Sequence, residues 1–588
     1  KMGESISRRS FLVGAAGAVA AAGLAGCAPQ PSGQAAAAGA ESDLPEAWDK
    51  EADVVIIGSG AGGAAAAWWA LKGGLSVIVL EEREEAGGSA IENAGQIAVG
   101  ATSIHKERGY DATSDQFKAF LKACGTDGVP DELLDIFVYQ GPEMIDWLTD
   151  IGVKWAPETI EDNCLIIQNE DGSIDTDAVS RCGLNSLGNE FHPNYIGGWD
   201  GHPQPLCLMA TWDDLEDEEF VEYRKDCMSS FAMDCHHGGA AYMLPILRGV
   251  RDMGGEILLN TTATRGYKDE TGQVVGVYAE QGSGGISVKA NKAVVIAAGN
   301  WMTDSDLLEQ YAGHVQYVGF YPLSVSDGGT AMKIGLDMGG HIVNSDSYWL
   351  SSESSFYLFS STTGRIGTTA PAIYVNADGA RFTAEDEYTP GTCGRLAYDR
   401  FVSPVEKRNR YVILRDEEYN RHMALLKWRV DSGLAGTYAV GGVDENAEYE
   451  CDYTTMTHAD TIPELAEALN MPFLETQIAI YNDSVEKGVD LQFNRFPENL
   501  RPFKDEDGPF HAGLVSPTWL GGYSHGGLDI DTNGQVLDSG YKPIPGLYAA
   551  GRSARSIAEG THEPSTGLSC AQAMVLGMVI GKHLSSEA

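Results

Sequence analysis

The sequence is poor in positive charge. Its 588 residues contain 40 Lys and Arg against 84 Asp and Glu, which gives a formal net charge of −44 at pH 7. Such a chain repels polyanions, so we exclude nucleic acid as a partner. We interpret the charge as a source of solubility.

Cysteine is present without a metal-binding pattern. The 10 cysteines include no CxxC and no CxxCH, which excludes a zinc ribbon and an attached c-type haem. The nearest approach to a metal site is the group Cys227, Cys235, His236 and His237. Its spacing fits no standard site. We interpret these residues as packing or surface positions and expect no metal.

The N-terminal residues contain no apolar run long enough to form a typical transmembrane helix. The apolar run over 11–26 is rich in Gly and Ala and is too short to cross a bilayer easily. It follows the twin-arginine pair Arg8-Arg9 and ends at Cys27. We expect 1–27 to be an export signal, with lipidation of Cys27 favoured over plain cleavage. This predicts a lipid-anchored protein in the periplasm or on the outer face of the cytoplasmic membrane.

A flexible linker is expected next, because residues 28–50 are rich in Ala, Pro, Ser and Gly. Beyond it, glycine is abundant, with 71 residues in the chain. The pattern that matters is Gly58, Gly60 and Gly63, which follows an apolar run of strand type. In such a loop the first glycine permits a tight turn, the second lets the backbone approach a pyrophosphate, and the third lets helix and strand pack closely.

The context of this loop makes it a strong dinucleotide signal. An alanine-rich helix follows to about Lys72, and a second strand over 76–80 ends in Glu81. The helix N-terminus would face phosphates, and Glu81 would accept hydrogen bonds from ribose hydroxyls.

Three later segments resemble those of FAD-binding flavoproteins and so favour FAD over NAD. Residues 82–89 read EREEAGGS, a second Gly-Gly-Ser loop, and 293–299 form another strand with a small-residue turn. The segment GLYAAG at 546–551 is again a strand followed by a turn, and we expect these three glycine-containing units to frame one cofactor. No second dinucleotide fingerprint occurs, so NAD(P)H is not an evident direct donor.

Several motifs stand in one order along the chain: Ser326-Asp327-Gly328-Gly329, Gly379-Ala380-Arg381-Phe382 followed by Glu385, Gly526-Gly527-Leu528-Asp529-Ile530-Asp531, and the GLYAAG segment. In these the chain resembles the flavoprotein family of fumarate reductases, succinate dehydrogenases and 3-ketosteroid dehydrogenases over 51–585. The resemblance implies an α/β fold, with a Rossmann-like FAD-binding domain (GR2-type) in two segments, 51–340 and 508–588. An α+β capping domain for the substrate, 341–507, would be inserted between them.

The same resemblance assigns the cofactor site. The residues expected at FAD are Gly58, Gly60, Ala61, Gly63, Glu81, Glu82, Gly88, Ser89, Gly95, Ala263, Ala298, Gly299, Asp327, Gly551, Gly567, Leu568 and Ser569. Small residues at 565–567 would let backbone amides approach the flavin, and 570–583 would be a packing helix. Members with covalent FAD carry a His in the loop that is 89–96 here, which has none. We therefore expect non-covalent FAD.

The resemblance leaves two candidates for the proton carrier. The family moves a hydride between flavin N5 and a carbon next to a carbonyl, while an acid or base handles the proton. Arg395 matches the proton-shuttling Arg of succinate dehydrogenases, although its pKa in water exceeds about 12. Tyr388 is the rival, by likeness to the base of ketosteroid dehydrogenases. A packing or salt-bridge role for either residue stays open.

The substrate positions depart from the dicarboxylate enzymes. Fumarate reductases hold a carboxylate with an Arg, which can pair bidentately, and with a His. Here Pro564 and Tyr523 stand at those positions, which argues against fumarate and succinate. Glu563 replaces the ketone-binding Tyr of ketosteroid dehydrogenases, and could instead cap the following helix.

We therefore predict an exported FAD-dependent oxidoreductase that reduces the C=C bond of an α,β-unsaturated carbonyl compound other than fumarate, as a respiratory acceptor. Arg395, Tyr388, Tyr523 and Glu563 are the candidate catalytic residues. A separate cytochrome or quinol-linked protein would supply electrons, since the chain has no haem motif. The alternatives are a 3-ketosteroid-type dehydrogenase and a non-catalytic flavin electron-transfer subunit.

Overall fold

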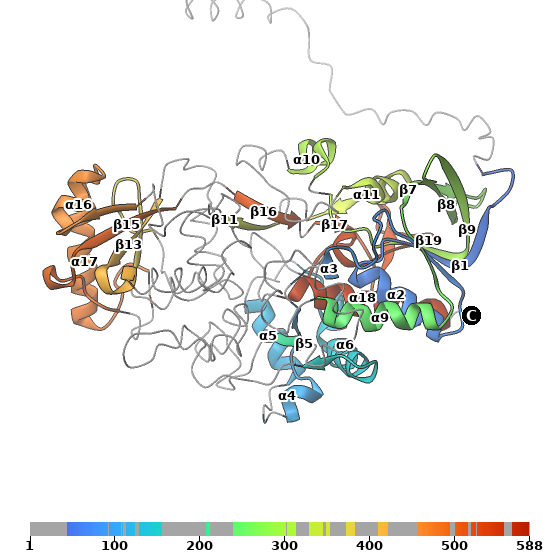
Figure 1. Cartoon of the computed structure of the whole chain (residues 1–588), viewed down its shortest axis with the longest axis horizontal. Helices are drawn as coiled ribbons and strands as arrows, with labels where there is room; N and C mark the ends of the chain where they lie inside the picture. The colour runs from blue at the N-terminus through green and yellow to red at the C-terminus, as the bar shows by residue number, and fades with distance from the viewer. Residues whose placement is uncertain are drawn as a thin grey trace, which may run out of the picture. The chain divides into compact units, whose positions relative to one another are not determined.

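The computed structural model of the chain is drawn in Figure 1. The residues that it describes are 44–91, 93, 95–107, 109, 113–123, 129–155, 207–211, 239–301, 303–312, 328–344, 348–352, 372–382, 410–420, 456–493, 495, 500–515, 519–524, 526–557 and 567–586. Within those ranges, the helices are too short or too polar for any of them to span a bilayer.

A parallel sheet carries the dinucleotide loop. Its strands in spatial order are β18 (Gln535–Leu537), β19 (Pro543–Ala549), β9 (Gly284–Ile296), β1 (Lys50–Ile57), β2 (Val77–Leu80) and β6 (Glu256–Leu258). Only β18 on this path is antiparallel to its neighbour. An antiparallel ribbon, β7 (Thr261–Lys268) and β8 (Val274–Gln281), continues from β9. The apolar runs of β1 and β2 are buried, as strands between helical layers require.

The carboxyl ends of the central strands lie level with one another. Ile57 pairs with both Leu80 and Ile296, and Ile296 pairs with Ala549. The four loops that leave these strands therefore start at one edge of the sheet. In open parallel sheets, this edge is where ligands bind.

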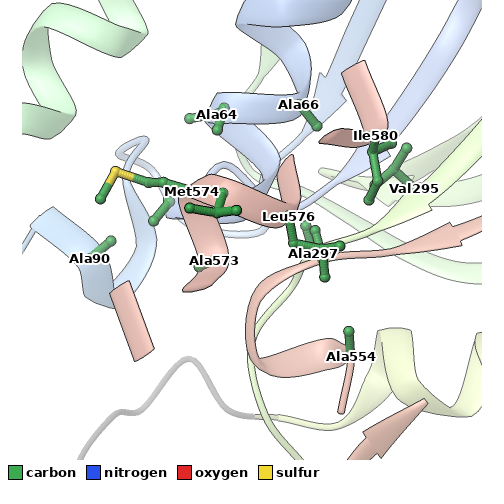
Figure 2. Close-up of a cluster of buried hydrophobic side chains, with 14 of the residues drawn as sticks. Ala64, Ala66, Ala90, Val295, Ala297, Ala554, Ala573, Met574, Leu576 and Ile580 are labelled. Carbon is green, nitrogen blue, oxygen red and sulfur yellow. The ribbon is translucent and has the colours of Figure 1, made fainter. Parts of the chain in front are cut away.

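Two helices from opposite ends of the sequence pack together on the sheet. They are α2 (Ala61–Lys72) and α18 (Leu568–Ser586). A Cβ atom on Gly577 would lie 2.3 Å from the Gly62 carbonyl oxygen, and one on Gly581 would lie 2.6 Å from the Trp69 Cβ. Figure 2 shows the small side chains of this contact, with alanines of α2 beside Met574 and Ile580 of α18. Small residues thus allow the two backbones to approach closely.

The other described elements of this part surround that core. The helices are α3 (Gly88–Ile91), α4 (Ser103–Glu107), α5 (Ser114–Ala123), α6 (Asp131–Asp150), α9 (Ala240–Asp252), α10 (Ser305–Ala312), α11 (Thr330–Asp337) and the 3₁₀ turn η7 (Gly551–Ser553). The small sheets are β3 (Gln96–Ala98) and β4 (Lys154–Trp155) on β5 (Cys207–Thr211), β10 (Ile342–Val343) on β17 (Gly527–Leu528), and β11 (Tyr348–Ser352) on β16 (Trp519–Ser524).

A four-stranded antiparallel sheet has a core of its own. Its order is β12 (Ile373–Asn376), β13 (Arg410–Arg415), β15 (Phe510–Val515) and β14 (Met456–Ala459), and α16 (Ile462–Ala468) and α17 (Leu474–Lys487) pack on it. The short 3₁₀ turn η6 (Asp505–Asp507) precedes β15. Strand β15 lies beyond residue 507, so this sheet continues past the expected 341–507 segment. The domain boundaries themselves stay predictions.

Candidate cofactor site

The glycine loop at the end of β1 has two closed positions and one open position. Gly58 has φ +97°, and a Cβ there would lie 2.5 Å from the Ala297 carbonyl oxygen. A Cβ on Gly63 would lie 2.0 Å from the Gly58 carbonyl oxygen. A Cβ on Gly60 would meet no atom within 4 Å. The first and third glycines are therefore required by packing, while the second borders open space.

The helix that starts at this loop presents its N-terminus there. Helix α2 begins at Ala61, and no side chain caps it at Gly60. The first N–H groups of any α-helix have no partner inside the helix, and they carry a partial positive charge. The loop and the helix start therefore suit an anionic group such as a diphosphate.

Glu81 holds the glycine loop from the end of β2. One carboxylate oxygen accepts hydrogen bonds from the Ser59 N–H, at 3.0 Å, and from the Ser59 hydroxyl, at 2.5 Å. The other accepts from the Arg83 N–H at 3.0 Å. A carboxylate offers about four acceptor positions, so roughly one stays for a ribose hydroxyl. Both Glu81 and Ser59 are buried.

The second glycine loop folds onto the first. The Gly87 N–H donates to the Ser59 hydroxyl oxygen at 2.8 Å. A Cβ on Gly88 would lie 3.3 Å from the Gly60 Cα. The GGS loop and the GxGxxG loop, predicted from separate motifs, are therefore in contact at the open position.

The GLYAAG segment reaches both of these loops. A Cβ on Gly62 would lie 2.9 Å from the Gly551 nitrogen. Arg552 donates from Nη2 to the Ser89 hydroxyl oxygen at 2.5 Å. The Ser553 hydroxyl donates to the Gly299 carbonyl oxygen at 2.8 Å, which ties the segment to the turn after β9. The three units that the sequence suggested would frame one cofactor therefore meet.

The start of α18 joins the same site through β3. The Ala98 N–H donates to the Gly567 carbonyl oxygen at 3.2 Å. Asn93 donates from Nδ2 to the Cys570 Sγ at 3.1 Å and to the Tyr242 hydroxyl at 2.5 Å, and its Oδ1 accepts from the Gly95 N–H at 2.6 Å. Burial, reinforced by Cys570, raises the pKa of Tyr242 well above its ordinary value. Asn93 thus links one expected FAD residue, Gly95, to α9 through Tyr242 and to the first turn of α18 through Cys570.

The remaining expected cofactor residues differ in how far they are buried. Ala263 is buried on β7 opposite Ala279, in the strand whose first residue, Thr261, donates its N–H to the Glu81 carbonyl. Glu82 is exposed, Ala298 and Ser569 are half-buried, and Leu568 is fully buried in the core.

The predicted substrate site falls largely outside the described residues. Tyr388, Arg395, Glu563 and Pro564 all lie outside the described residues. So do the expected cofactor residue Asp327, the motif residue Glu385 and the group Cys227, Cys235, His236 and His237. Tyr523 is described only by its backbone, which lies on β16 opposite Trp349. Where the structure does describe the chain, no three His, Cys, Asp or Glu residues gather as metal ligands would.

Comparison with known proteins decides the family. Residues 53–567 match the family described as FAD binding domain. The chain belongs to this FAD-binding family.

Similar proteins extend over nearly the whole chain. A 3-oxosteroid 1-dehydrogenase of Mycolicibacterium smegmatis is 24% identical, over 92% of this chain and 98% of the relative. The acrylate reductase flavoprotein subunit of Shewanella woodyi is 26% identical, over 98% of each. A solved 3-ketosteroid-delta4-(5alpha)-dehydrogenase from Rhodococcus jostii superposes with a TM-score of 0.67, at 21% identity, over 92% of this chain and 98% of its own. This chain is an FAD-dependent oxidoreductase of the kind that acts on C=C or CH–CH bonds.

The residues present fit the FAD of this family. The open face at Gly60, the uncapped start of α2 and the buried Glu81 are what a dinucleotide diphosphate and ribose require. Sequence reasoning missed Ser59, Asn93, Arg552 and Ser553. The signal for them was a position within two residues of an expected cofactor glycine, and most of their partners lie far away in the sequence.

Proposed function

We propose that this protein reduces the C=C bond of an α,β-unsaturated carbonyl compound other than fumarate. The observation that carries the proposal is the near-complete coverage of two relatives, an acrylate reductase flavoprotein subunit and a 3-oxosteroid 1-dehydrogenase. Acrylate is an unsaturated carboxylate and a 3-oxosteroid is a ketone, so each name denotes a substrate with a C=O group. The loss of both carboxylate-holding positions, at Pro564 and Tyr523, argues for a substrate that is not a dicarboxylate.

The chain's own residues would bind and orient the cofactor. FAD, when bound, supplies hydride chemistry at the flavin. Glu81 fixes Ser59 and would accept a hydrogen bond from a ribose hydroxyl, while the first turn of α2 would bind the diphosphate. We propose that FAD is held without a covalent bond, because the loop over 89–96 has no His.

Proton transfer to the substrate is assigned to the segment after Phe382. Arg395 and Tyr388 are the candidates, and Glu563 would bind the polar end of the substrate. A Tyr is the simpler acid, because an Arg gives up its proton only in a dry, charge-compensated site. In this arrangement either residue would lie in the capping domain proposed for 341–507, inserted in a two-segment FAD domain of the GR2 type.

We further propose that the enzyme acts outside the cytoplasmic membrane in respiration, anchored by a lipid on Cys27. A separate cytochrome or quinol-linked protein would supply its electrons. The twin-arginine pattern at Arg8-Arg9 supports this placement, and the absence of CxxCH supports a separate electron donor.

A 3-ketosteroid-type dehydrogenase is the second candidate, and the match to the Mycolicibacterium smegmatis protein favours it. It would run the same chemistry in the direction of oxidation. The replacement of Tyr by Glu563 opposes it. A non-catalytic electron-transfer subunit would show neither activity.

The test is anaerobic reoxidation of the reduced flavin. Residues 40–588 are purified with FAD and reduced with a viologen dye, and fumarate, acrylate, cinnamate-type acids, enones and 3-ketosteroids are added in turn. We expect rapid reoxidation by one of the alkenes and none by fumarate. Reoxidation by fumarate alone would contradict the substrate class. Reduction of the oxidised flavin by a saturated ketone, added to enzyme that has not been treated with the dye, would instead establish the dehydrogenase.

A further inference from the structure

Three loops that are distant in the sequence close on one another at the cofactor site. The GxGxxG loop touches the GGS loop through Gly60 and Gly88, and it touches η7 through Gly62 and Gly551. The third side of this ring is not made by glycines. It is made by the Arg552 guanidinium, which donates to the Ser89 hydroxyl at 2.5 Å.

Arg552 is placed by the backbone rather than by chance. Gly551 has φ +62°, a left-handed conformation that glycine adopts without strain. Just beyond it, the Ser553 hydroxyl is bonded to the Gly299 carbonyl, and Ser553 is buried. Arg552 therefore lies between two fixed residues, with its side chain half-buried and directed to the residue that follows Gly88.

The charges of this site call for a cation. The FAD diphosphate carries two negative charges, and the chain itself carries −44. Glu81 is buried beside the glycine loop, and the segment that connects it to the GGS loop holds three exposed carboxylates, Glu82, Glu84 and Glu85, against one cation, the half-buried Arg83. The start of α2 offers only about half a positive charge. A diphosphate bound among these carboxylates needs a further counter-charge.

We propose that Arg552 is a cofactor-binding residue whose guanidinium binds the FAD diphosphate, with Ser89 fixing its position. A planar guanidinium can give a phosphate group two parallel hydrogen bonds, which a lysine cannot. The proposal rests on FAD binding by this family and is independent of the substrate proposed above.

The test uses the full chain from which FAD has been removed, titrated with FAD and, separately, with ADP. ADP has the diphosphate but no flavin ring, so it isolates the proposed contact. For Arg552→Gln we expect the Kd for both FAD and ADP to rise about 10- to 100-fold, because a charge-assisted hydrogen bond is lost. Added salt should weaken FAD binding less steeply in this variant than in the parent, because one charge pair is missing.

Two further variants keep the test sharp. Arg552→Lys keeps the charge and should retain much of the ADP affinity at low salt. Arg251→Gln makes the same substitution on the exposed last turn of α9 and should leave both Kd values unchanged. Thermal unfolding of each cofactor-free variant shows whether it folds.

Two outcomes would overturn the proposal. The first is an unchanged Kd for FAD and for ADP in a folded Arg552→Gln protein. The second is weaker FAD binding with unchanged ADP binding and a shifted flavin midpoint potential. That result would mean that Arg552 contacts the flavin ring and not the diphosphate. Neither result depends on which substrate the enzyme reduces. The proposal for Arg552 and the proposed function can therefore be refuted independently of each other.

Discussion

The FAD-binding part and the four-stranded sheet are stabilised by different means. Helices α2 and α18 meet through Gly and Ala, and their backbones approach so closely that a Cβ on Gly577 has no room. In the four-stranded part, charged side chains are buried instead. Arg381 makes a bidentate ion pair with Asp490, and Arg415 makes an ion pair with Glu418. All four side chains are almost completely buried.

The difference shows what each part cannot tolerate. The first part is sensitive to added volume, because its neighbours are backbone atoms that cannot move aside. The second is sensitive to the loss of one charge partner, because the remaining ion would be buried alone. A binding site for a large cofactor needs the first kind of rigidity.

The largest expected effect comes from adding one methyl group at Gly63. Gly63→Ala places a Cβ only 2.0 Å from the Gly58 carbonyl oxygen, and we expect it to lower the free energy of unfolding by about 4 kcal/mol or more. Gly60→Ala is the matched control, since its backbone suits alanine and its Cβ meets nothing. Its cofactor-free stability should change by less than about 0.5 kcal/mol, while FAD binding weakens. Urea unfolding with and without FAD measures both, and equal stability losses would refute the distinction.

A smaller effect is expected from the buried ion pair of the four-stranded part. Burial alone would raise the pKa of Asp490, but the hydrogen bonds and charge of Arg381 hold it below its ordinary value. Arg381→Leu should therefore lower the free energy of unfolding by about 3–5 kcal/mol. The double variant with Asp490→Leu should recover part of that loss, because no lone charge remains. Denaturant titration of the set checks this, and a double variant as unstable as the sum of the singles would contradict it.

The pH dependence of His511 gives the smallest of the three effects. Burial, and next the neighbouring His458, lower its pKa to about 4, against the opposing pull of Asp416. Because the folded pKa is below the ordinary 6.5, this contribution to stability is present above pH 6.5 and is lost as the pH falls towards 4. After a discount for solvent screening and for the coupling to His458, the loss amounts to about 1–2 kcal/mol. His511→Asn should flatten the stability curve over that range, measured by unfolding at several pH values; an unchanged slope would assign the acid sensitivity to other groups.

The sequence sufficed for the local parts of the cofactor site. Strand β1, helix α2 and strand β2 follow from apolar runs and glycine spacing, and the resulting loop ends at Glu81 as expected. The FAD cofactor, too, was predicted from the motifs, and membership of the family confirms it. These features depend on residues close together in the sequence, so hydrophobic patterns and glycine spacing are enough to predict them.

Features that join distant residues could not be predicted in this way. Arg552 bonds to Ser89 across 463 positions, and Asn93 to Cys570 across 477. Likewise, Arg381 was recognised only as part of a family motif, although its guanidinium is buried on Asp490. Partner choice of this kind is fixed by tertiary packing. The candidate proton carriers, Arg395 and Tyr388, stay predictions.

The position of β19 and α18 has a consequence for synthesis of the protein. Strand β19 covers the edge of β9, and α18 covers α2, yet both are translated long after the elements that they cover. A nascent chain on the ribosome therefore carries an open sheet edge and an uncovered helix while everything between β9 and β19 is made. The expected cofactor site is complete only after its last residues in the sequence, Gly551 and those over 567–569, have been translated. Cofactor insertion is thus a late event in the life of each molecule, and a chaperone that shields β9 until then would raise the yield of holoenzyme.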